Sequence, residues 1–252
     1  MSIKKVLVSQ PKPSSSKSPY YTIAEKYGIV MDFKPLIKVE SLSAKEFRQQ
    51  KISILDHSAV IFTSRHAIDH FFNLCEEMRI EVPDTMKYFC VSEIVALYIQ
   101  KYVQYRKRKI FFGSTGKIDG LVPHILKHKK EKFIAPLSDI HTHDLKNLLS
   151  ENNLGLTEAV MYRTVSNKIN ENDFFDYDMI IFFSPSGVDS LKINYPDFQQ
   201  ANIKIGTLGN STAKAVEEAG LRLDFRAPTP ECPSITGALE NFLKTAGNNN
   251  SK

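Results

Sequence analysis

The sequence DHSAVIFTSRHAID at residues 56–69 has a counterpart, DYDMIIFFSPSGVD, at residues 176–189. The two stretches share Asp, Ile, Phe, Ser and Asp at matching positions. Each contains a short apolar run, typical of a buried strand, followed by a hydroxyl residue that can begin a helix. A second, weaker match sets residues 91–96 beside residues 208–213. Two matches in the same order predict two similar domains.

Short apolar runs alternate with helical patterns along the rest of the chain, which is typical of a parallel sheet covered by helices. Most runs are followed by Ser, Thr, Gly or Pro and then by an amphipathic segment. We therefore expect an α/β protein with two similar flavodoxin-like parallel-sheet domains. The strands expected most clearly are residues 5–9, 59–63, 87–91, 109–112, 132–135, 179–183 and 203–207.

The two domains are not expected to divide the chain at its middle, because one strand and helix precede the first copy of the repeated stretch. We expect a discontinuous first domain, residues 1–36 and 166–252, and an inserted second domain, residues 41–158. The segments at 32–40 and 158–165 alternate apolar and polar residues and are expected to pair as a two-stranded β connector. Two thin crossings between domains predict a hinge.

The composition is that of a globular protein with a real core. Of the 252 residues, 42% are hydrophobic and 24% charged, and the formal net charge is +5. This composition excludes a disordered chain. The apolar runs are far shorter than the roughly 18 residues of a membrane helix, and the first residues lack the apolar region of a secretory signal. We expect a cytoplasmic protein without membrane contact.

Nucleotide and nucleic-acid sites are disfavoured by the motifs present. Gly113–Lys117 resembles the end of a phosphate-binding loop, but Phe111 stands where that loop needs its first glycine. No GxGxxG pattern follows any expected strand. Basic runs at 106–109 and 127–130 are modest, and no nucleic-acid-binding module accompanies them. We expect these runs to form solvated surface and the protein to bind no nucleic acid.

The sequence also contains no pattern typical of a metal site or of a disulfide framework. Cys75, Cys90 and Cys232 are widely spaced and have no CxxC partner, so we expect reduced thiols. His141 and His143 could be metal ligands, but no third ligand with the usual spacing lies near them. A polar loop before a helix is the expectation there. No metal and no cofactor are predicted.

Hydroxyl residues at the expected helix starts are the more informative feature. Ser64 and Ser184 each stand where a buried strand meets a helix, and Ser211–Thr212 mark a third such turn. The free amides at a helix N-terminus and the positive end of the helix dipole bind carboxylate or phosphate well. Plain N-capping without a ligand would require the same residues. A matched pair of such turns in two domains favours anion binding in one cleft.

The ordered set of motifs resembles the uroporphyrinogen-III synthase family over nearly the whole chain. The resemblance includes the two-domain plan with its two-stranded connector. Two departures occur: Gln10 stands where the family frequently has Arg, and the family's Gly and Thr in one turn are Ser92 and Val95 here. The motifs are KKVLVSQP at 4–11, IFTSRHAI at 61–68, MYRTV at 161–165, FFSPSGV at 182–188, GNSTAKAVEEAG at 209–220 and APTPE at 227–231.

The resemblance implies a cofactor-independent lyase of tetrapyrrole (haem) biosynthesis. Its substrate would be hydroxymethylbilane, a linear tetrapyrrole with eight carboxylates. The enzyme inverts the terminal pyrrole, closes the ring and releases water to give uroporphyrinogen III. A cleft that must open and close favours a monomer, and a transient contact with the preceding enzyme of the pathway would be compatible with it.

The resemblance also implies roles for individual residues. Tyr162 on the connector would be catalytic, donating a hydrogen bond to the departing hydroxyl; a tyrosine that only packs on an exposed ladder is the alternative. Ser92 is the candidate to replace the missing threonine hydroxyl, since Val95 has none. The residues expected to bind substrate are Ser64, His66, Ser92, Ser184, Ser186, Gly187, Gly209 and Thr212.

Two other functions remain open on the sequence. A non-catalytic two-domain hinge protein that binds a small polyanion would share the fold and the anion-binding turns. A pair of receiver-like domains would need an acidic cluster after the first strand, and Ser9–Lys12 stands there instead. Turnover separates the first alternative from the synthase.

Overall fold

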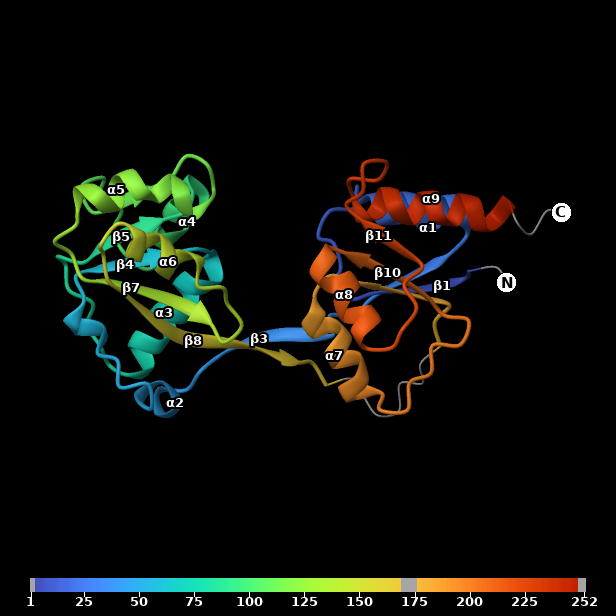
Figure 1. The fold of residues 1–252 in the computed structure, drawn as a ribbon, viewed down its shortest axis with the longest axis horizontal. Coiled ribbons are helices and arrows are strands. Elements are labelled where there is room, and N and C mark those ends of the chain that lie inside the picture. Colours follow the sequence, from blue (N-terminus) through green and yellow to red (C-terminus); the bar gives the residue numbers. More distant parts are fainter. Residues whose placement is uncertain (1–2, 169–175, 249–252) are drawn as a thin grey trace. The chain divides into compact units, whose positions relative to one another are not determined.

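Two compact units make up the chain, and each has its own sheet. The computed structural model describes residues 3–168 and 176–248. Unit 1 comprises Met1–Lys38 and Val165–Lys252, and unit 2 comprises Val39–Thr164. Helices cover both faces of each sheet (Figure 1). The predicted α/β class with two mainly parallel sheets is confirmed. Within the described residues, no helix has the length and apolarity needed to cross a membrane.

The sheet of unit 1 has five strands in the order β11-β10-β9-β1-β2, and all neighbours run parallel. A parallel order requires helical crossovers, which the chain supplies. The strands are β1 (Lys5–Val8), β2 (Val30–Phe33), β9 (Met179–Phe182), β10 (Lys204–Leu208) and β11 (Phe225–Ala227). The helices are α1 (Pro19–Tyr27), α7 (Pro185–Asn194), α8 (Asn210–Glu218) and α9 (Ile235–Asn248).

Alternation along the strands of unit 1 builds a core on each face of its sheet. Val6 and Val8 belong to one cluster, together with residues of α1 and α9. Leu7 belongs to the other cluster, together with residues of α7 and α8. Successive side chains of a strand point to opposite faces, so an unbroken apolar run serves both cores. Figure 1 shows α1 and α9 on one side of this sheet and α7 and α8 on the other.

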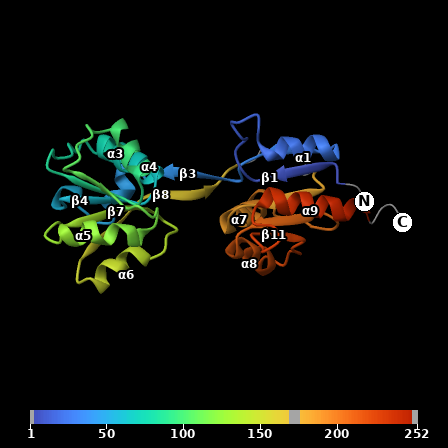
Figure 2. The ribbon, with the colours of Figure 1, turned by 90° about the horizontal axis from the view of Figure 1, so that it is seen from above.

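The sheet of unit 2 has six strands in the order β3-β8-β7-β4-β5-β6. Figure 2 shows α3 and α4 on one side of this sheet and α5 and α6 on the other. Its strands are β3 (Ile37–Ser41), β4 (Ala59–Phe62), β5 (Lys87–Cys90), β6 (Ile110–Phe112), β7 (Phe133–Ser138) and β8 (Leu156–Ser166). Its helices are α2 (Ala44–Arg48), α3 (Arg65–Glu77), α4 (Glu93–Tyr98), α5 (Val122–Lys127) and α6 (Asp144–Glu151), with short 3-10 turns at Ile54–Asp56, Ile99–Lys101 and Ile118–Leu121.

Two strands, β3 and β8, carry the chain between the units. They are neighbours in the six-stranded sheet. The Asn167 amide donates to the Leu36 carbonyl and the Leu42 amide donates to the Met161 carbonyl, so residue numbers rise on one strand as they fall on the other. The pair is therefore antiparallel. The expected connector range 32–40 starts earlier than β3, because residues 32 and 33 belong to β2 of the other sheet.

The three cysteines are free thiols in different environments, and the two buried ones allow a direct test of the core of unit 2. Cys75 and Cys90 are buried, and burial raises the pKa of each thiol to about 12. Cys232 is half-buried. Because the thiolate is the reactive form, we expect one thiol per native chain to react with a disulfide reagent at mildly alkaline pH. All three should react in denaturant, and rapid reaction of a second native thiol would contradict this burial.

Candidate functional site

Ser184 begins the turn between β9 and α7 in unit 1. It is the N-cap of α7, and its hydroxyl accepts a hydrogen bond from the Gly187 amide at 3.2 Å. Gly187 is buried, and a Cβ placed on it would lie 3.5 Å from the Ser184 Oγ and 3.9 Å from the Ser9 Oγ. The absence of a side chain at Gly187 therefore leaves space beside two hydroxyls at adjacent strand ends. Ser186 is half-buried in the same turn.

Gly209 and Thr212 lie in the neighbouring turn, between β10 and α8. Gly209 is the N-cap of α8 with φ +89°, a backbone conformation that favours glycine. A glycine cap has no side chain to accept from the first amides of the helix, so these amides are available to water or to an anion. Thr212 is buried in the first turn of α8. Because β9 and β10 are adjacent, the two turns of unit 1 lie at the same edge of its sheet.

Ser64 occupies the corresponding place in unit 2, between β4 and α3. Its hydroxyl accepts a hydrogen bond from the Ala67 amide at 3.1 Å, as the Ser184 hydroxyl does from Gly187. The two N-caps also share an extended backbone, with φ −157° and −155°. The matched turns predicted from the repeated sequence are thus confirmed as matched helix starts. Their capping bonds alone would account for both serines, so ligand binding needs further support.

Tyr162 of β8 meets Ser64 in unit 2. Burial raises the pKa of the Tyr162 phenol, and the nearby Ser64 hydroxyl partly opposes this rise. The Ser64 oxygen accepts from the Ala67 amide, and the phenol of Tyr162 can itself donate a hydrogen bond to a ligand. The structure brings together these two predicted residues, which are far apart in the sequence.

His70 is a neighbour of Tyr162 that the sequence did not single out. Its ring stacks on the Tyr162 ring with centroids 4.7 Å apart and planes at 19°. Its Nδ1 lies 2.6 Å from the Oγ of Ser41, at the end of β3. Burial lowers the pKa of His70, and the nearby charge of His66 lowers it further, against the opposing effect of Asp69. The His70 imidazole is thus neutral at physiological pH, and its ring packs on the Tyr162 ring and holds it against β8.

His66, one helical turn before His70, is exposed on α3. Arg65 beside it is also exposed, with its guanidinium 5.8 Å from the centre of the Tyr98 ring. Lys101 pairs with Asp69 at 2.9 Å, so one carboxylate of this surface is already neutralised. The start of α3 therefore combines a helix N-terminus with cationic side chains, an arrangement that attracts anions.

Ser92 follows the adjacent strand β5 and is the N-cap of α4. Its hydroxyl accepts from the Val95 amide at 3.4 Å, and the Val95 side chain is buried in the core of unit 2. An apolar side chain at position 95 thus adds to packing where the resemblance expects a threonine. Whether Ser92 supplies the missing hydroxyl to a ligand stays a prediction.

The predicted site residues fall into two groups, one in each unit. Ser64, His66, Ser92 and Tyr162 lie in unit 2, at or near the carboxyl ends of β4 and β5 and on β8. The other five, from two adjacent turns, lie in unit 1. Each group can bind anions by itself, and the unit 2 group adds a phenol that can donate a hydrogen bond. Ligand-binding edges of this kind are typical of parallel α/β sheets.

One cluster among the described residues has the composition of a metal site. His141, His143 and Glu158 bring potential ligand atoms within 4.8 Å of one another in unit 2. The cluster contains none of the predicted site residues.

Comparison with known proteins identifies a family for this arrangement. The HEM4 family model, described as uroporphyrinogen-III synthase HemD, matches residues 18–237. The structure of uroporphyrinogen-III synthetase from Helicobacter pylori is similar with a TM-score of 0.60 and 16% identity, over 96% of this chain and 100% of that one. A mutant uroporphyrinogen III synthase from the extremely thermophilic bacterium Thermus thermophilus gives a TM-score of 0.52 and 15% identity, over 96% of this chain and 99% of that one. At these identities the likeness shows the fold alone. The comparison with curated proteins gives no significant match.

Proposed function

Because this chain belongs to the uroporphyrinogen-III synthase family, whose model spans residues 18–237, we propose that its two groups of site residues bind and cyclise that family's substrate. The protein is a cyclising lyase of tetrapyrrole biosynthesis. It converts hydroxymethylbilane to uroporphyrinogen III by inverting the terminal pyrrole, closing the ring and releasing water. Without an enzyme, the bilane closes to the type I isomer, so the catalyst must control geometry as well as rate.

Tyr162 is proposed to assist the first chemical step, the departure of the terminal hydroxyl. The observation that carries this proposal is the position of the Tyr162 phenol, which lies near the Ser64 hydroxyl at the N-terminus of α3 and stacks on the His70 ring. Loss of the hydroxyl leaves a cationic azafulvene. A hydrogen bond from the phenol would stabilise the leaving oxygen, whereas full proton transfer is disfavoured by the raised pKa of Tyr162. Neutral His70 behind the ring adds no charge that would oppose the developing cation.

The helix-start turns of both units are proposed to bind the carboxylates of the substrate. Eight carboxylates need many anion sites, and helix N-termini provide them without the desolvation cost of buried lysines. The turns at Ser184 and Gly209 support this role because both are at one edge of the unit 1 sheet. Held in this way, the chain of pyrroles can fold so that the inverted ring attacks through a spiro intermediate. Such orientation can supply much of the acceleration without a nucleophile.

An isomer assay tests the function directly. Hydroxymethylbilane is generated in situ, the purified protein is added without metal or nucleotide, and the oxidised type I and type III uroporphyrins are separated by chromatography. We expect a strong rise in type III. Type I alone, from protein shown to be folded by circular dichroism, would contradict the synthase and leave a non-catalytic polyanion-binding protein to be tested by calorimetry.

Gly187→Ala is expected to raise KM for the bilane by roughly 10- to 150-fold while leaving the fold intact, since one lost charge-assisted hydrogen bond costs about 1.5–3 kcal/mol. The new methyl would lie 3.5 Å from the Ser184 Oγ and 3.9 Å from the Ser9 Oγ, which are ordinary contacts. The helix start should therefore survive, but the methyl would fill the space where a carboxylate meets these hydroxyls. Steady-state kinetics with the isomer assay provides the measurement.

Gly237→Ala is the matched control for this variant. The Gly237 amide donates to the Ser234 Oγ at 3.1 Å, so the same Ser-x-x-Gly cap occurs at the start of α9 in the same unit. A Cβ there would lie 3.1 Å from the Ser234 Oγ, slightly tighter than at Gly187. We expect Gly237→Ala to leave KM unchanged. Equal effects of both variants would mean that the Ser184 turn is a structural cap and nothing more.

Three further features remain sequence predictions. They are the monomeric state, a transient contact with the preceding enzyme of the pathway, and the cytoplasm as the place of the reaction. We also propose that the strands β3 and β8, which carry the chain from one unit to the other, act as a hinge. Sedimentation of the purified chain, with and without the preceding enzyme, addresses the first two.

A further inference from the structure

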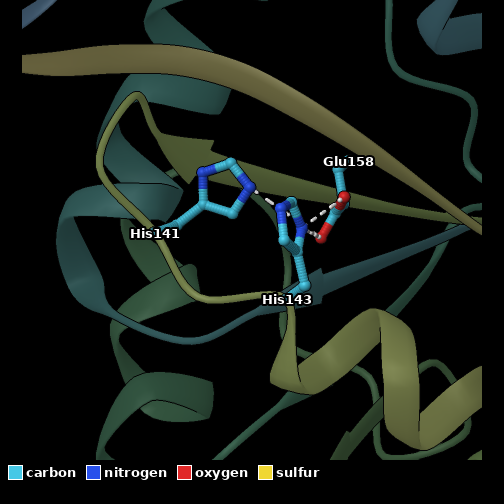
Figure 3. Close-up of side chains that lie close together, drawn as sticks. All are labelled: His141, His143 and Glu158. Carbon is cyan, nitrogen blue, oxygen red and sulfur yellow. Dashed lines mark hydrogen bonds and ion pairs between the residues drawn. The ribbon is translucent and has the colours of Figure 1, made fainter.

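Three side chains of unit 2 converge beside β8 (Figure 3), and none of them is assigned to the substrate. His141 belongs to the connection between β7 and α6, His143 is the N-cap of α6, and Glu158 lies on β8. The Nδ1 of His143 is 3.0 Å from both carboxylate oxygens of Glu158. The Nε2 of His141 is 3.8 Å from the Oε1 of the same carboxylate.

The tautomer of His141 is fixed by the backbone carbonyl of Ser138. Its Nδ1 lies 2.6 Å from the Ser138 carbonyl oxygen, which can only accept, so Nδ1 carries the proton. In the neutral ring, Nε2 then has a lone pair. This nitrogen is buried and has no hydrogen-bond partner, although burying an unpaired polar atom is costly. Metal-binding histidines commonly use this arrangement, with one nitrogen donating to a carbonyl and the other directed at the metal.

Glu158 completes the set with an anionic ligand. Its side chain is only 12% exposed, and Lys146 reaches its Oε2 at 3.5 Å. In a tetrahedral zinc site the ligand atoms lie roughly 3.3 Å apart, given metal–ligand distances of about 2.0–2.1 Å. The separations of 3.0 Å and 3.8 Å between Glu158 and the two imidazole nitrogens bracket this value, and all three ligand atoms lie within 4.8 Å of one another. Two imidazoles and a carboxylate are a donor set that suits Zn²⁺ and leaves a fourth position for water.

We propose that His141, His143 and Glu158 form a binding site for a divalent transition-metal ion of the zinc type. The ion would take the lone pair of His141 Nε2, and it would replace the proton now shared between His143 and Glu158. Lys146 would turn away to solvent, where its exposed side chain has room. Binding would thereby supply a partner for the one buried nitrogen of the cluster that lacks one.

Such an ion would tie the connection between β7 and α6 to β8. Asp139 of this connection already bonds to β8, through its amide to the Tyr162 carbonyl at 3.0 Å and through its Oδ1 to the Thr164 amide at 3.1 Å. The metal would add a third link between this connection and β8, through Glu158. The expected consequence is a more stable unit 2, since an ion that binds the folded state alone stabilises it.

The test uses the full-length, tag-free protein after treatment with a chelator. We expect calorimetry to show one Zn²⁺ bound per chain, with a rise in the melting temperature. Co²⁺ in place of Zn²⁺ should give the visible absorption of a tetrahedral site. His141→Ala and Glu158→Gln should each weaken Zn²⁺ binding by about tenfold or more, since metal ligands contribute directly to affinity. Lys146→Met should strengthen it, because a competing cation is removed.

His57→Ala is the matched control. The Nδ1 of His57 also lies near a backbone carbonyl, that of Ser53 at 2.9 Å, and this ring too is beside β8. Its Nε2 is already bonded to the Thr157 Oγ1 at 2.7 Å, so no lone pair is available. We expect His57→Ala to bind Zn²⁺ as the parent chain does. Failure of the parent chain to bind, or undiminished binding by His141→Ala, would overturn the proposal. Neither result would affect the isomer assay, which needs no added metal.

Discussion

Tyr162→Phe is expected to lower the rate of type III formation by about 10- to 100-fold without disturbing the fold. General acid catalysis contributes roughly 10²–10⁴-fold, and a phenol that only donates a hydrogen bond should lie at or below the lower end of that range. The substitution removes one oxygen and leaves the ring, which stacks on His70 at 4.7 Å. The packing of β8 is therefore retained.

The electrostatics of the pair explain why the hydroxyl matters. Burial raises the pKa of Tyr162, so the phenol stays protonated across the physiological range. The nearby Ser64 hydroxyl partly opposes this rise. In Tyr162→Phe the Ser64 hydroxyl keeps its capping bond with the Ala67 amide. The helix start should survive, and the loss should fall on turnover.

Tyr102→Phe serves as the matched control for Tyr162→Phe. Its ring stacks on Phe72 at 4.6 Å, so it too is a stacked tyrosine of unit 2, and its hydroxyl donates to Asp69. We expect Tyr102→Phe to leave the rate and the type III fraction unchanged. Unchanged turnover in Tyr162→Phe would remove this residue from the mechanism. A matching fall in melting temperature and activity would instead assign it to packing.

The repeated sequence predicted the two-unit fold because its signal is local. Apolar runs such as 59–63 and 179–183 place strands β4 and β9 within one residue of their observed ends. The serine after each run is the N-cap of the next helix in the structure, at Ser64 and Ser184. Strand periodicity and capping chemistry are properties of a few neighbouring residues, so the sequence carries them directly.

The contacts around Tyr162 could not be predicted in the same way, because they depend on strand register. Ser41, His70 and Tyr162 come from β3, α3 and β8, which lie far apart in the sequence. The pairing of β7 with β8 also shifts by one residue, since Leu137 faces Val160 but Ser138 faces Tyr162. Such a bulge changes which side chains point to each face of the sheet, and no pattern in the sequence predicts it.

The same limit applies to the proposed metal cluster. His141 and His143 are visible as a pair in the sequence, but Glu158 is separated from them by helix α6. Parallel pairing of β7 and β8 brings Glu158 opposite Ala135, near the connection that carries both histidines. A ligand search limited to short sequence spacing therefore finds two ligands and misses the third.

Phe89→Ala is expected to lower the free energy of unfolding of unit 2 by about 3–5 kcal/mol, the usual cost of removing a fully buried phenylalanine. Phe89 is 0% exposed in β5, which lies between β4 and the edge strand β6. Its ring lies 5.0 Å from that of Phe111, 5.4 Å from Phe133 and 5.5 Å from His128. These rings come from two other strands and from the end of α5. None of them can therefore fill the cavity left by Phe89→Ala without a movement of its own backbone.

Urea denaturation and hydrogen exchange measure this effect. Because every aromatic partner of Phe89 belongs to unit 2, we expect faster exchange in peptides covering β5, Lys87–Cys90, and little change in those covering β9, Met179–Phe182. Phe111→Ala is the control, since that half-buried ring should cost less. A loss below about 1 kcal/mol for Phe89→Ala would contradict a close-packed core at this position. A large loss matters for function as well, because the same sheet, through β4 and β8, holds Ser64 against Tyr162.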